Sequence, residues 1–259
     1  MRLRFLGTGT SFGVPVIGCD CAVCTSTNRR NRRTRHSLAL EADGRVLLVD
    51  TPPELRLQIL DAGIQDVDAV FLTHMHADHV HGIDDLRIFT VRGRGPVRMF
   101  VAAEHAGELR ARFPYIFDAR IRPSPGTTAP RIDLQTFGPG EQLRAAGLEL
   151  HALAFPHGNT RSYGFRVGSL GVIVDGKSIP EPSREVLQGV EVLVINALWW
   201  GNPHPTHFNV EEAIATAHEL GAERTFLTHL THRLDYEALV ARLPAEVTPA
   251  FDGLVVDID

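Results

Sequence analysis

The sequence contains no run of about 18 apolar residues, the length that a membrane-spanning helix requires. Its first residues, Met1 to Gly7, lack the apolar core of a secretory signal peptide. A large charge of one sign is also missing, because 26 basic residues face 31 acidic ones and the formal net charge is -5. These absences predict a cytoplasmic protein with no membrane partner. They also disfavour a nucleic-acid partner, which a global positive field would attract.

Cysteine is scarce, and all three copies fall between residues 19 and 24. The segment reads Cys19-Asp20-Cys21-Ala22-Val23-Cys24, and an odd, clustered set of thiols is a poor disulfide framework. Structural zinc commonly takes three thiolates and one imidazole. We therefore expect a zinc knuckle at 19–24 that a distant histidine completes. The alternative is a set of reduced, buried or reactive thiols.

A dense histidine motif is the most informative feature that the chain does contain. The apolar run from Ala69 to Thr73 predicts a buried strand, and it leads directly into His74-Met75-His76-Ala77-Asp78-His79. In an extended segment, His74 and His76 point to the same side and can bind one metal ion. Asp78 and His79 can face a second ion, and two ions about 3.5–4 Å apart form a hydrolytic centre. The alternative is a solvated, histidine-rich loop.

Short strands dominate the expected secondary structure, with fewer helices between them. We predict strands at 2–6, 37–41, 45–49, 69–73, 148–155, 163–167, 172–174, 190–196, 225–228 and 254–258, and helices at 54–62, 84–92, 103–112, 182–188 and 210–220. Asn209 and Gly221 bound the last helix as N-cap and C-terminal glycine. Residues 122–130, rich in proline, are expected to form a loop or a crossover between two strand-rich halves. With no evident linker, a single domain over 1–259 is the simplest interpretation.

Three further metal-type ligands follow predicted strands. His157 comes after 148–155, Asp175 after 172–174 and His229 after 225–228. One such histidine alone would more often be a surface residue, but three of these positions beside the first motif favour one site. The sequence thus assigns His74, His76 and His157 to one ion, Asp78, His79 and His229 to the other, and Asp175 to both. A carboxylate suits the bridging position because its two oxygens can bind two cations and offset their charge.

In this arrangement the sequence resembles the metallo-beta-lactamase fold hydrolases, through His-x-His-x-Asp-His at 74–79 and the later His157, Asp175 and His229. Within that superfamily it resembles the branch typified by the phosphoribosyl cyclic phosphate phosphodiesterase PhnP. The segments that carry this match are the cysteine cluster at 19–24, His204 to Asn209 and Thr228 to Asp235. The resemblance implies an α/β fold of the four-layered αβ/βα sandwich type.

The resemblance also implies roles for individual residues. The three cysteines would share their structural zinc with His232, three positions after the last active-site ligand. His207 would be the general acid, with its neighbour His204 as competitor and a structural cap before the next helix as the alternative role. Asp78 is counted as a catalytic residue as well as a ligand. Asp50 would orient a ligand histidine, although a role in a tight turn explains Asp50 almost as well.

These assignments predict a dinuclear metal-dependent phosphodiesterase that acts on a small phosphodiester, cyclic diesters included. Two divalent ions, zinc or manganese, would lower the pKa of a bridging water and so supply a hydroxide nucleophile. The exact substrate, the physiological metal and the oligomeric state stay open, with a homodimer among the options. The alternatives are a nuclease that processes RNA, a thioester or lactone hydrolase of the same fold, and a non-catalytic carrier protein.

Five arginines within residues 29–35 form the densest basic run in the chain. Such a run can contact RNA or form a rim that collects phosphate. It can equally be a solvated loop that nearby acids neutralise.

Overall fold

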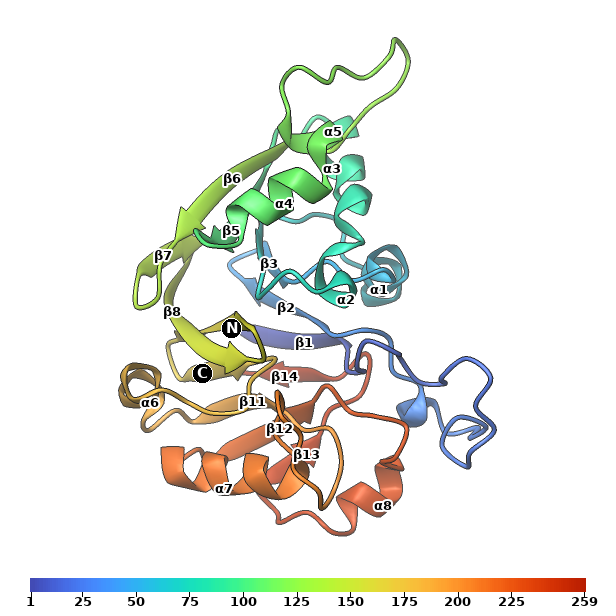
Figure 1. Ribbon diagram of the computed structural model, residues 1–259, viewed down its shortest axis with the longest axis vertical. Coiled ribbons are helices and arrows are strands. Elements are labelled where there is room, and N and C mark those ends of the chain that lie inside the picture. Colours follow the sequence, from blue (N-terminus) through green and yellow to red (C-terminus); the bar gives the residue numbers. More distant parts are fainter.

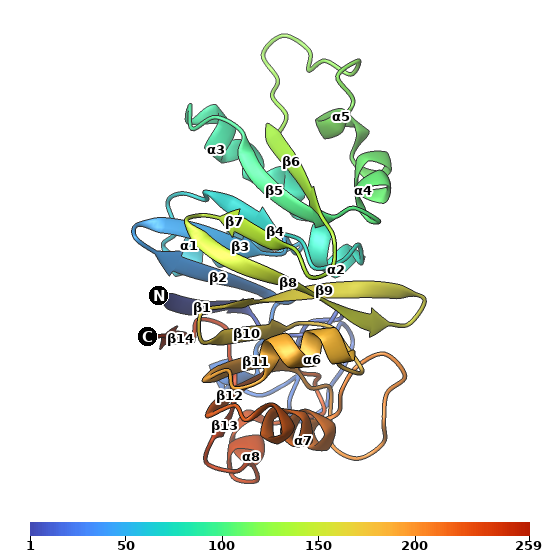
Figure 2. The ribbon, with the colours of Figure 1, turned by 90° about the vertical axis from the view of Figure 1, so that its left-hand side faces the viewer.

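The computed structural model describes residues 1–259 and contains two seven-stranded mixed sheets that lie face to face (Figures 1 and 2). In spatial order, the first sheet consists of β14 (Val255–Asp257), β1 (Arg2–Gly7), β2 (Ser37–Ala42), β3 (Arg45–Val49), β4 (Ala69–Phe71), β5 (Val97–Ala102) and β6 (Ile132–Phe137). The second consists of β13 (Val247–Pro249), β12 (Arg224–Thr228), β11 (Val192–Asn196), β10 (Leu170–Ile173), β9 (Thr160–Val167), β8 (Leu148–His157) and β7 (Gln142–Ala145).

Helices cover the outer face of each sheet (Figure 2). Those outside the first sheet are α1 (Leu55–Ala62), α2 (Ala77–Val80), α3 (Arg87–Val91), α4 (Ala106–Arg112) and α5 (Pro114–Phe117); those outside the second are α6 (Glu181–Leu187), α7 (Val210–Leu220) and α8 (Tyr236–Val240). Two short 3-10 helices are η1 (Arg29–Asn31) and η2 (Ile83–Leu86). The four layers confirm the predicted αβ/βα sandwich. None of the helices is both long and apolar enough to cross a bilayer.

Strand alternation explains the layers. Leu38 and Leu40 of β2 pack into the core between the sheets, whereas Ala39 packs into the core under the helices of the first sheet. Neighbouring side chains of a strand point to opposite faces, so a strand with apolar residues at every position must be covered on both sides. The second sheet follows the same rule, with Val194 facing the first sheet and Ile195 facing α7.

The two sheets repeat one pattern of strand pairing. In the first, β1, β2 and β3 are antiparallel, and β3 to β6 are parallel. In the second, β7 to β10 are antiparallel, and β10 to β13 are parallel. Parallel strands end at the same edge of a sheet, which is where ligand sites of α/β sheets usually form. This edge carries the histidine motif and two of the three later ligand positions.

The helix at 210–220 has the predicted bounds. The Asn209 side chain accepts a hydrogen bond from the Glu212 N–H, the Glu212 carboxylate accepts one from the Asn209 N–H, and Gly221 ends the helix at φ +72°. Elsewhere, the predicted helix at 84–92 is divided into η2 and α3. Residues 122–130 are a loop, but they join α5 to β6 within the first half. The chain crosses between the sheets at 138–141, so for residues 122–130 the loop is confirmed and the alternative of a crossover is not.

Candidate metal centre and active site

The ends of four strands bring the predicted ligands together. The segment after β4 carries His74 and His76, and α2 follows with Asp78 and His79. His157 ends β8, Asp175 follows β10 and His229 follows β12. The first four residues come from the first sheet and the last three from the second, so the site lies where the two sheets meet.

Three imidazoles and one carboxylate form the first group, at His74, His76, His157 and Asp175. The His74 Nε2 to His76 Nδ1 distance is 2.9 Å, and the His157 Nε2 to His76 Nδ1 distance is 3.3 Å. Oδ2 of Asp175 lies 3.6 Å from His74 Nε2 and 3.7 Å from His157 Nε2. Ligands held about 2.1 Å from a tetrahedral metal ion are about 3.4 Å apart, so this spacing fits one divalent ion.

The second group contains Asp78, His79 and His229. Oδ2 of Asp78 lies 3.3 Å from His79 Nε2. Asp175 also borders this group, with Oδ2 3.6 Å from His79 Nε2 and Oδ1 3.3 Å from His229 Nε2. Asp175 therefore lies between the two groups, at the position that the sequence assigned to a bridging carboxylate.

Unpartnered buried atoms point into this cluster. Nε2 of His79, Oδ1 of Asp175 and Nε2 of His229 are buried and have no hydrogen-bond partner. Buried polar atoms in folded proteins nearly always have a partner, and nitrogen and oxygen donors of this kind suit divalent metal ions. The residues present thus fit the metal ions that the ligand pattern implies.

The protonation states of His74, His229 and Asp175 suit metal ligands as well. Burial holds the pKa of His74 well below its usual range and lowers the pKa of His229 to about 4, so both imidazoles are neutral at pH 7. Burial alone would raise the pKa of Asp175, but the imidazoles of His229 and His207 hold it well below its usual range. Neutral imidazoles and ionised carboxylates are the forms that bind metal.

Asp50 supports the cluster from behind. Its Oδ2 lies 2.7 Å from His79 Nδ1, and it accepts hydrogen bonds from the Thr73 N–H at 2.8 Å and the Thr73 hydroxyl at 2.9 Å. Asp50 is fully buried and has a positive φ of 66°. This contact fixes the ring of His79 so that Nε2 faces the cluster, which is the usual arrangement behind a metal-ligating histidine.

A glycine allows α2 to lie this close to Asp50. The N–H of Thr51 donates to the His79 carbonyl at 2.7 Å, and the N–H of Gly82 donates to the Thr51 carbonyl at 2.8 Å. A Cβ at position 82 would lie 2.0 Å from the Pro52 carbonyl oxygen, so only glycine fits here.

Sequence reasoning missed His36. This residue, at the start of the β2 region, is fully buried, and neither ring nitrogen has a hydrogen-bond partner. Its ring stacks on that of His79, with centroids 6.2 Å apart. No motif signals His36, because it stands outside the histidine clusters and directly after the arginine run.

The loop before α7 brings His207, rather than His204, to the metal groups. Nε2 of His207 lies 3.3 Å from Asp175 Oδ2, and its ring stacks on that of His229 with centroids 4.9 Å apart. The Thr206 hydroxyl lies 2.8 Å from His207 Nδ1 and 3.2 Å from His204 Nδ1. His204 is therefore one contact further from the cluster than His207.

The cavity over the cluster is small and polar. It has a volume of about 230 Å³, and none of its ten lining residues is hydrophobic. Besides the metal groups and His207, Ser11, Asn159 and Thr206 line it. Two cations near motif residues are paired instead: Arg161 with Glu104, and Lys177 with Glu212 at 2.5 Å.

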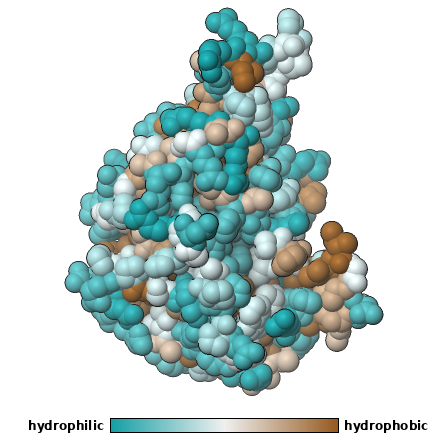
Figure 3. Space-filling view, in the orientation of Figure 1, coloured by the Kyte–Doolittle hydropathy of each residue, from teal (hydrophilic) through white to brown (hydrophobic).

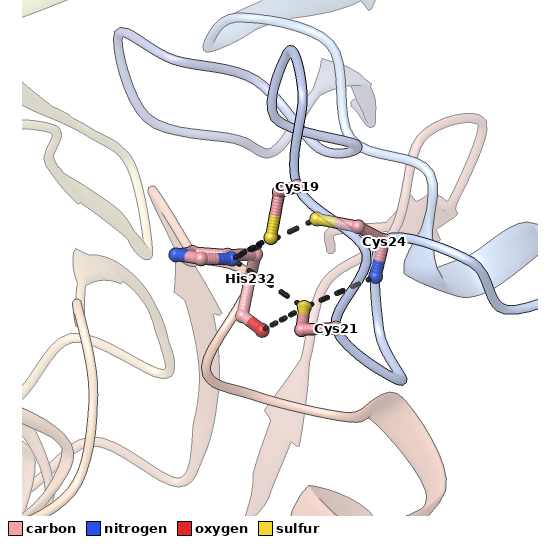
Figure 4. A group of neighbouring side chains, drawn as sticks. All are labelled: Cys19, Cys21, Cys24 and His232. Atoms are coloured by element: carbon pink, nitrogen blue, oxygen red, sulfur yellow. Dashed lines mark hydrogen bonds between the residues drawn. The ribbon is translucent and has the colours of Figure 1, made fainter.

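The cysteine knuckle converges on His232 (Figure 4). The three sulfur atoms of Cys19, Cys21 and Cys24 lie 3.3, 3.5 and 3.6 Å from His232 Nδ1. A tetrahedral zinc ion with ordinary bond lengths separates sulfur and nitrogen ligands by about 3.6 Å, so the group fits one zinc ion. A hydrogen bond from the Cys24 N–H lowers the pKa of Cys21 to about 6, which favours the thiolate that zinc binds.

The arginine run is partly internal, which the sequence did not predict. Arg33 is fully buried and donates to the carbonyl oxygens of Thr231 and Leu234, both at 2.7 Å. Arg35 forms an ion pair with Glu54. The interpretation of the whole run as a solvated loop, an RNA contact or a phosphate rim was wrong for Arg33, because its guanidinium holds the loop that follows β12.

Comparison with known proteins agrees with this geometry. Residues 45–230 match the family described as beta-lactamase superfamily domain. The crystal structure of a diphosphatase from the PhnP family superposes with a TM-score of 0.89 and 36% identity, covering all of this chain and 98% of the other. The chain belongs to the PhnP family of the beta-lactamase superfamily. This confirms the resemblance drawn from the sequence and the metallo-beta-lactamase fold.

Two other matches are more limited. The octanoyltransferase of Porphyromonas gingivalis is 37% identical over all of this chain, but the aligned part is 52% of that protein. The chain spans about half the length of the first curated relatives that it matches. The activities of those full-length proteins are therefore not assigned to this chain. The zinc-bound structure of PqqB from Methylobacterium extorquens has a TM-score of 0.77 at 21% identity over the full length of both chains, which shows the shared fold. The metallo-beta-lactamase fold occurs mostly in hydrolases and implies divalent metal ions, and the ligand groups described above agree with that chemistry.

Proposed function

We propose that this PhnP-family protein is a dinuclear metal-dependent phosphodiesterase for small phosphodiesters. The observation that carries the proposal is the cluster of two ligand groups around Asp175 at the bottom of a polar cavity of about 230 Å³. A cavity of this size admits a phosphate group and its immediate substituents, since sites for whole drug-sized ligands are about 300–1,000 Å³. The absence of an apolar lining disfavours thioesters with a long acyl chain.

Seven residues would hold the ions. His74, His76 and His157 would bind one, Asp78, His79 and His229 the other, and Asp175 both. When bound, zinc or manganese would supply a nucleophile by lowering the pKa of water and would neutralise charge on the phosphate. Asp78 and Asp175 would keep the net charge of the occupied site low, and Asp50 would hold His79 in its binding orientation.

His207 would protonate the leaving oxygen. Its Nε2 is buried at the cavity, is 3.3 Å from Asp175 and has no hydrogen-bond partner, so it is free to face a substrate oxygen. The Thr206 hydroxyl, 2.8 Å from Nδ1, can donate a hydrogen bond to Nδ1, which fixes the ring orientation and keeps the ring proton on Nε2. A general acid placed in this way contributes about 10²–10⁴-fold to a rate.

Hydrolysis of a diphosphate bond is the second candidate. The solved structure at 36% identity over nearly the full length of both chains is described as a diphosphatase. A diphosphate diester presents the same non-bridging oxygens to the ions and differs in its leaving group, a phosphate that needs less protonation. A nuclease is less well supported, because no arginine or lysine lines the cavity. A non-catalytic carrier would not need the complete ligand set.

We also propose that residues 1–259 act as one domain, since both halves contribute to the inter-sheet core.

The test compares leaving groups. Purified protein with measured metal content is assayed on methyl p-nitrophenyl phosphate, a dialkyl cyclic phosphate, a diphosphate diester, a thioester and a lactone. We expect His207→Ala to reduce turnover of the cyclic diester, whose leaving alkoxide needs a proton, far more than turnover of the p-nitrophenyl ester. His204→Ala is the matched control and should change both little. Activity confined to thioesters or lactones would refute the proposal, and equal losses on both esters would refute the role of His207.

A further inference from the structure

The loop between β12 and α8 joins the active site to the cysteine knuckle. His229, its first residue, belongs to the second metal group, and His232 completes the cysteine group three positions later. His229 has a positive φ of 58°, a conformation that a non-glycine residue keeps only when its surroundings hold it. We call residues 229–234 the β12–α8 loop. Because both ligand groups share this short loop, a change at one of them can reach the other.

The knuckle has few other supports. It lies on the segment between β1 and β2, where residues 10–28 contain one isolated bridge, at Val14, but no helix or strand. The most prominent hydrophobic group in the view of Figure 3 lies on this projecting segment, and Phe12 and Ile17 are 72% and 97% exposed. Apolar side chains that face water add nothing to a core, so the segment depends on its ligand group for its shape.

Thr231 bonds the β12–α8 loop to the loop that carries His207. Residues 198–208 form the second loop, which we call the His207 loop. The Thr231 hydroxyl donates to the Leu198 carbonyl at 2.6 Å, and the Leu198 N–H donates to the Phe208 carbonyl at 3.1 Å. Leu198 and Phe208 are the two ends of the His207 loop, so Thr231 holds its base. The buried Arg33 in turn donates to the Thr231 carbonyl at 2.7 Å.

A second contact joins the same two loops through side chains. The guanidinium of Arg233 lies over the ring of Trp199, 4.7 Å from the ring centroid. The Trp199 indole N–H donates to the Asn202 carbonyl at 2.8 Å, within the His207 loop. Because Arg233 directly follows the knuckle ligand His232, a displacement of the knuckle would also reach Trp199.

The metal ligand His229 has separate supports. On one side of it, the Ala197 N–H donates to the Thr228 carbonyl at 2.9 Å, and on the other the Leu230 N–H donates to the Thr8 carbonyl at 2.8 Å. Neither bond involves the knuckle ligands. Loss of zinc from the knuckle should therefore displace the His207 loop more than the ligands of the active-site ions.

We propose that Thr231 is a positioning residue for His207, through which zinc in the knuckle controls protonation of the leaving group. This inference rests on the phosphodiesterase function proposed above. With the base of the His207 loop held, Nε2 of His207 faces the cavity. A displacement of about 1 Å in a catalytic group can cost about 100-fold in rate. Diesters with a poor leaving group would thus be hydrolysed efficiently only by protein with a loaded knuckle.

The first test removes the Thr231 hydroxyl. Thr231→Val keeps the shape of the side chain without the donor, and Thr231→Ser keeps the donor. We expect Thr231→Val to reduce turnover of a dialkyl cyclic phosphate by about 10-fold or more and that of methyl p-nitrophenyl phosphate by less than about 2-fold, with both active-site ions still bound. Thr231→Ser should restore turnover of the cyclic diester.

Thr225→Val is the matched control, because Thr225 is buried on the same strand side of the loop, in β12, and its hydroxyl has no hydrogen-bond partner. It should change turnover of neither ester. Equal losses on both esters in Thr231→Val would overturn the proposal, and so would the loss of an active-site ion, because Thr231 would then act on His229 instead.

The second test needs no substrate, so it separates this inference from the proposed function. The chain has two tryptophans, and Trp200→Phe leaves Trp199 as the only one. In that background, Cys21→Ser should release the knuckle zinc and shift the emission of Trp199 to longer wavelength, because its ring loses the cover of Arg233 and meets water. Unchanged emission after measured zinc loss would overturn the coupling of the two loops. A shifted emission in a protein without phosphodiesterase activity would support that coupling and refute the proposed function alone.

Discussion

Replacing Asp50 by asparagine should weaken metal binding without breaking the fold. Asp50 is at φ +66°, a backbone conformation that asparagine tolerates far better than alanine, so Asp50→Asn changes mainly the side-chain chemistry. The carboxylate contacts three donor groups, namely His79 Nδ1, the Thr73 N–H and the Thr73 hydroxyl. A carboxamide has only one accepting oxygen, so at least one of these groups loses its partner.

The magnitude follows from the role of the contact. Loss of the residue that orients a metal-ligating histidine typically costs 10–100-fold in metal affinity, which is about 1.4–2.7 kcal/mol. The unsatisfied donor should also reduce the stability of the metal-free protein by about 1–3 kcal/mol, because Asp50 is completely buried. Both effects come from one side chain, and separate measurements distinguish them.

The assay is a zinc titration against a chromophoric chelator, with thermal unfolding of the metal-free protein measured beside it. Asp68→Asn is the control, since Asp68 accepts a backbone hydrogen bond from Val46 at 2.8 Å but is exposed and lies at the opposite end of β4. We expect wild-type affinity in the control. If Asp50→Asn binds zinc as tightly as the wild type while unfolding at a lower temperature, Asp50 serves only the turn, and the reasoning about His79 is refuted.

Three further predictions concern the acid, the knuckle and a buried carboxyl. His207→Ala should keep its full metal content by mass spectrometry while losing activity; metal loss would make His207 a ligand instead. Cys21→Ser should lower zinc content by one ion per chain and lower the melting temperature, with ligand residues of the cavity still loaded; unchanged zinc would mean that the knuckle is empty. Burial raises the pKa of Asp252 to about 6, above its usual 3.8, so its contribution to stability is full below pH 4 and is lost as pH rises through 6. Asp252→Asn should therefore remove about 3 kcal/mol of pH dependence between pH 4 and 7 in chemical denaturation, and an unchanged slope would contradict this.

Local patterns explain why much of the fold was predictable. The apolar run before His74 and the N-cap Asn209 are signals contained within a few residues. Strands β5 and β6 were not predicted, because β5 carries the exposed Arg98 at its second position and β6 alternates between half-buried and exposed positions. Their pairing depends on contacts with the rest of the sheet rather than on their own composition.

The residues of the candidate site were likewise only partly predictable from the sequence. The ligand residues could be named because four of them form the dense motif at 74–79 and the other three each follow a predicted apolar strand. His36, Arg33 and Asp252 could not, since their roles depend on which distant segments they meet. Asp252, for example, binds Thr8 and Thr34, two residues that are more than 200 positions away along the chain.

Neither half of the chain has a full set of ligands for both ions. His74 and its neighbours precede residue 138, and His157, Asp175 and His229 follow residue 141. Bound ions would consequently link the two halves of the chain, in addition to the apolar contacts between the two sheets. A chelator should therefore first weaken the contact between the two halves. Protease cleavage in the connecting segment at 138–141 would then report metal loss.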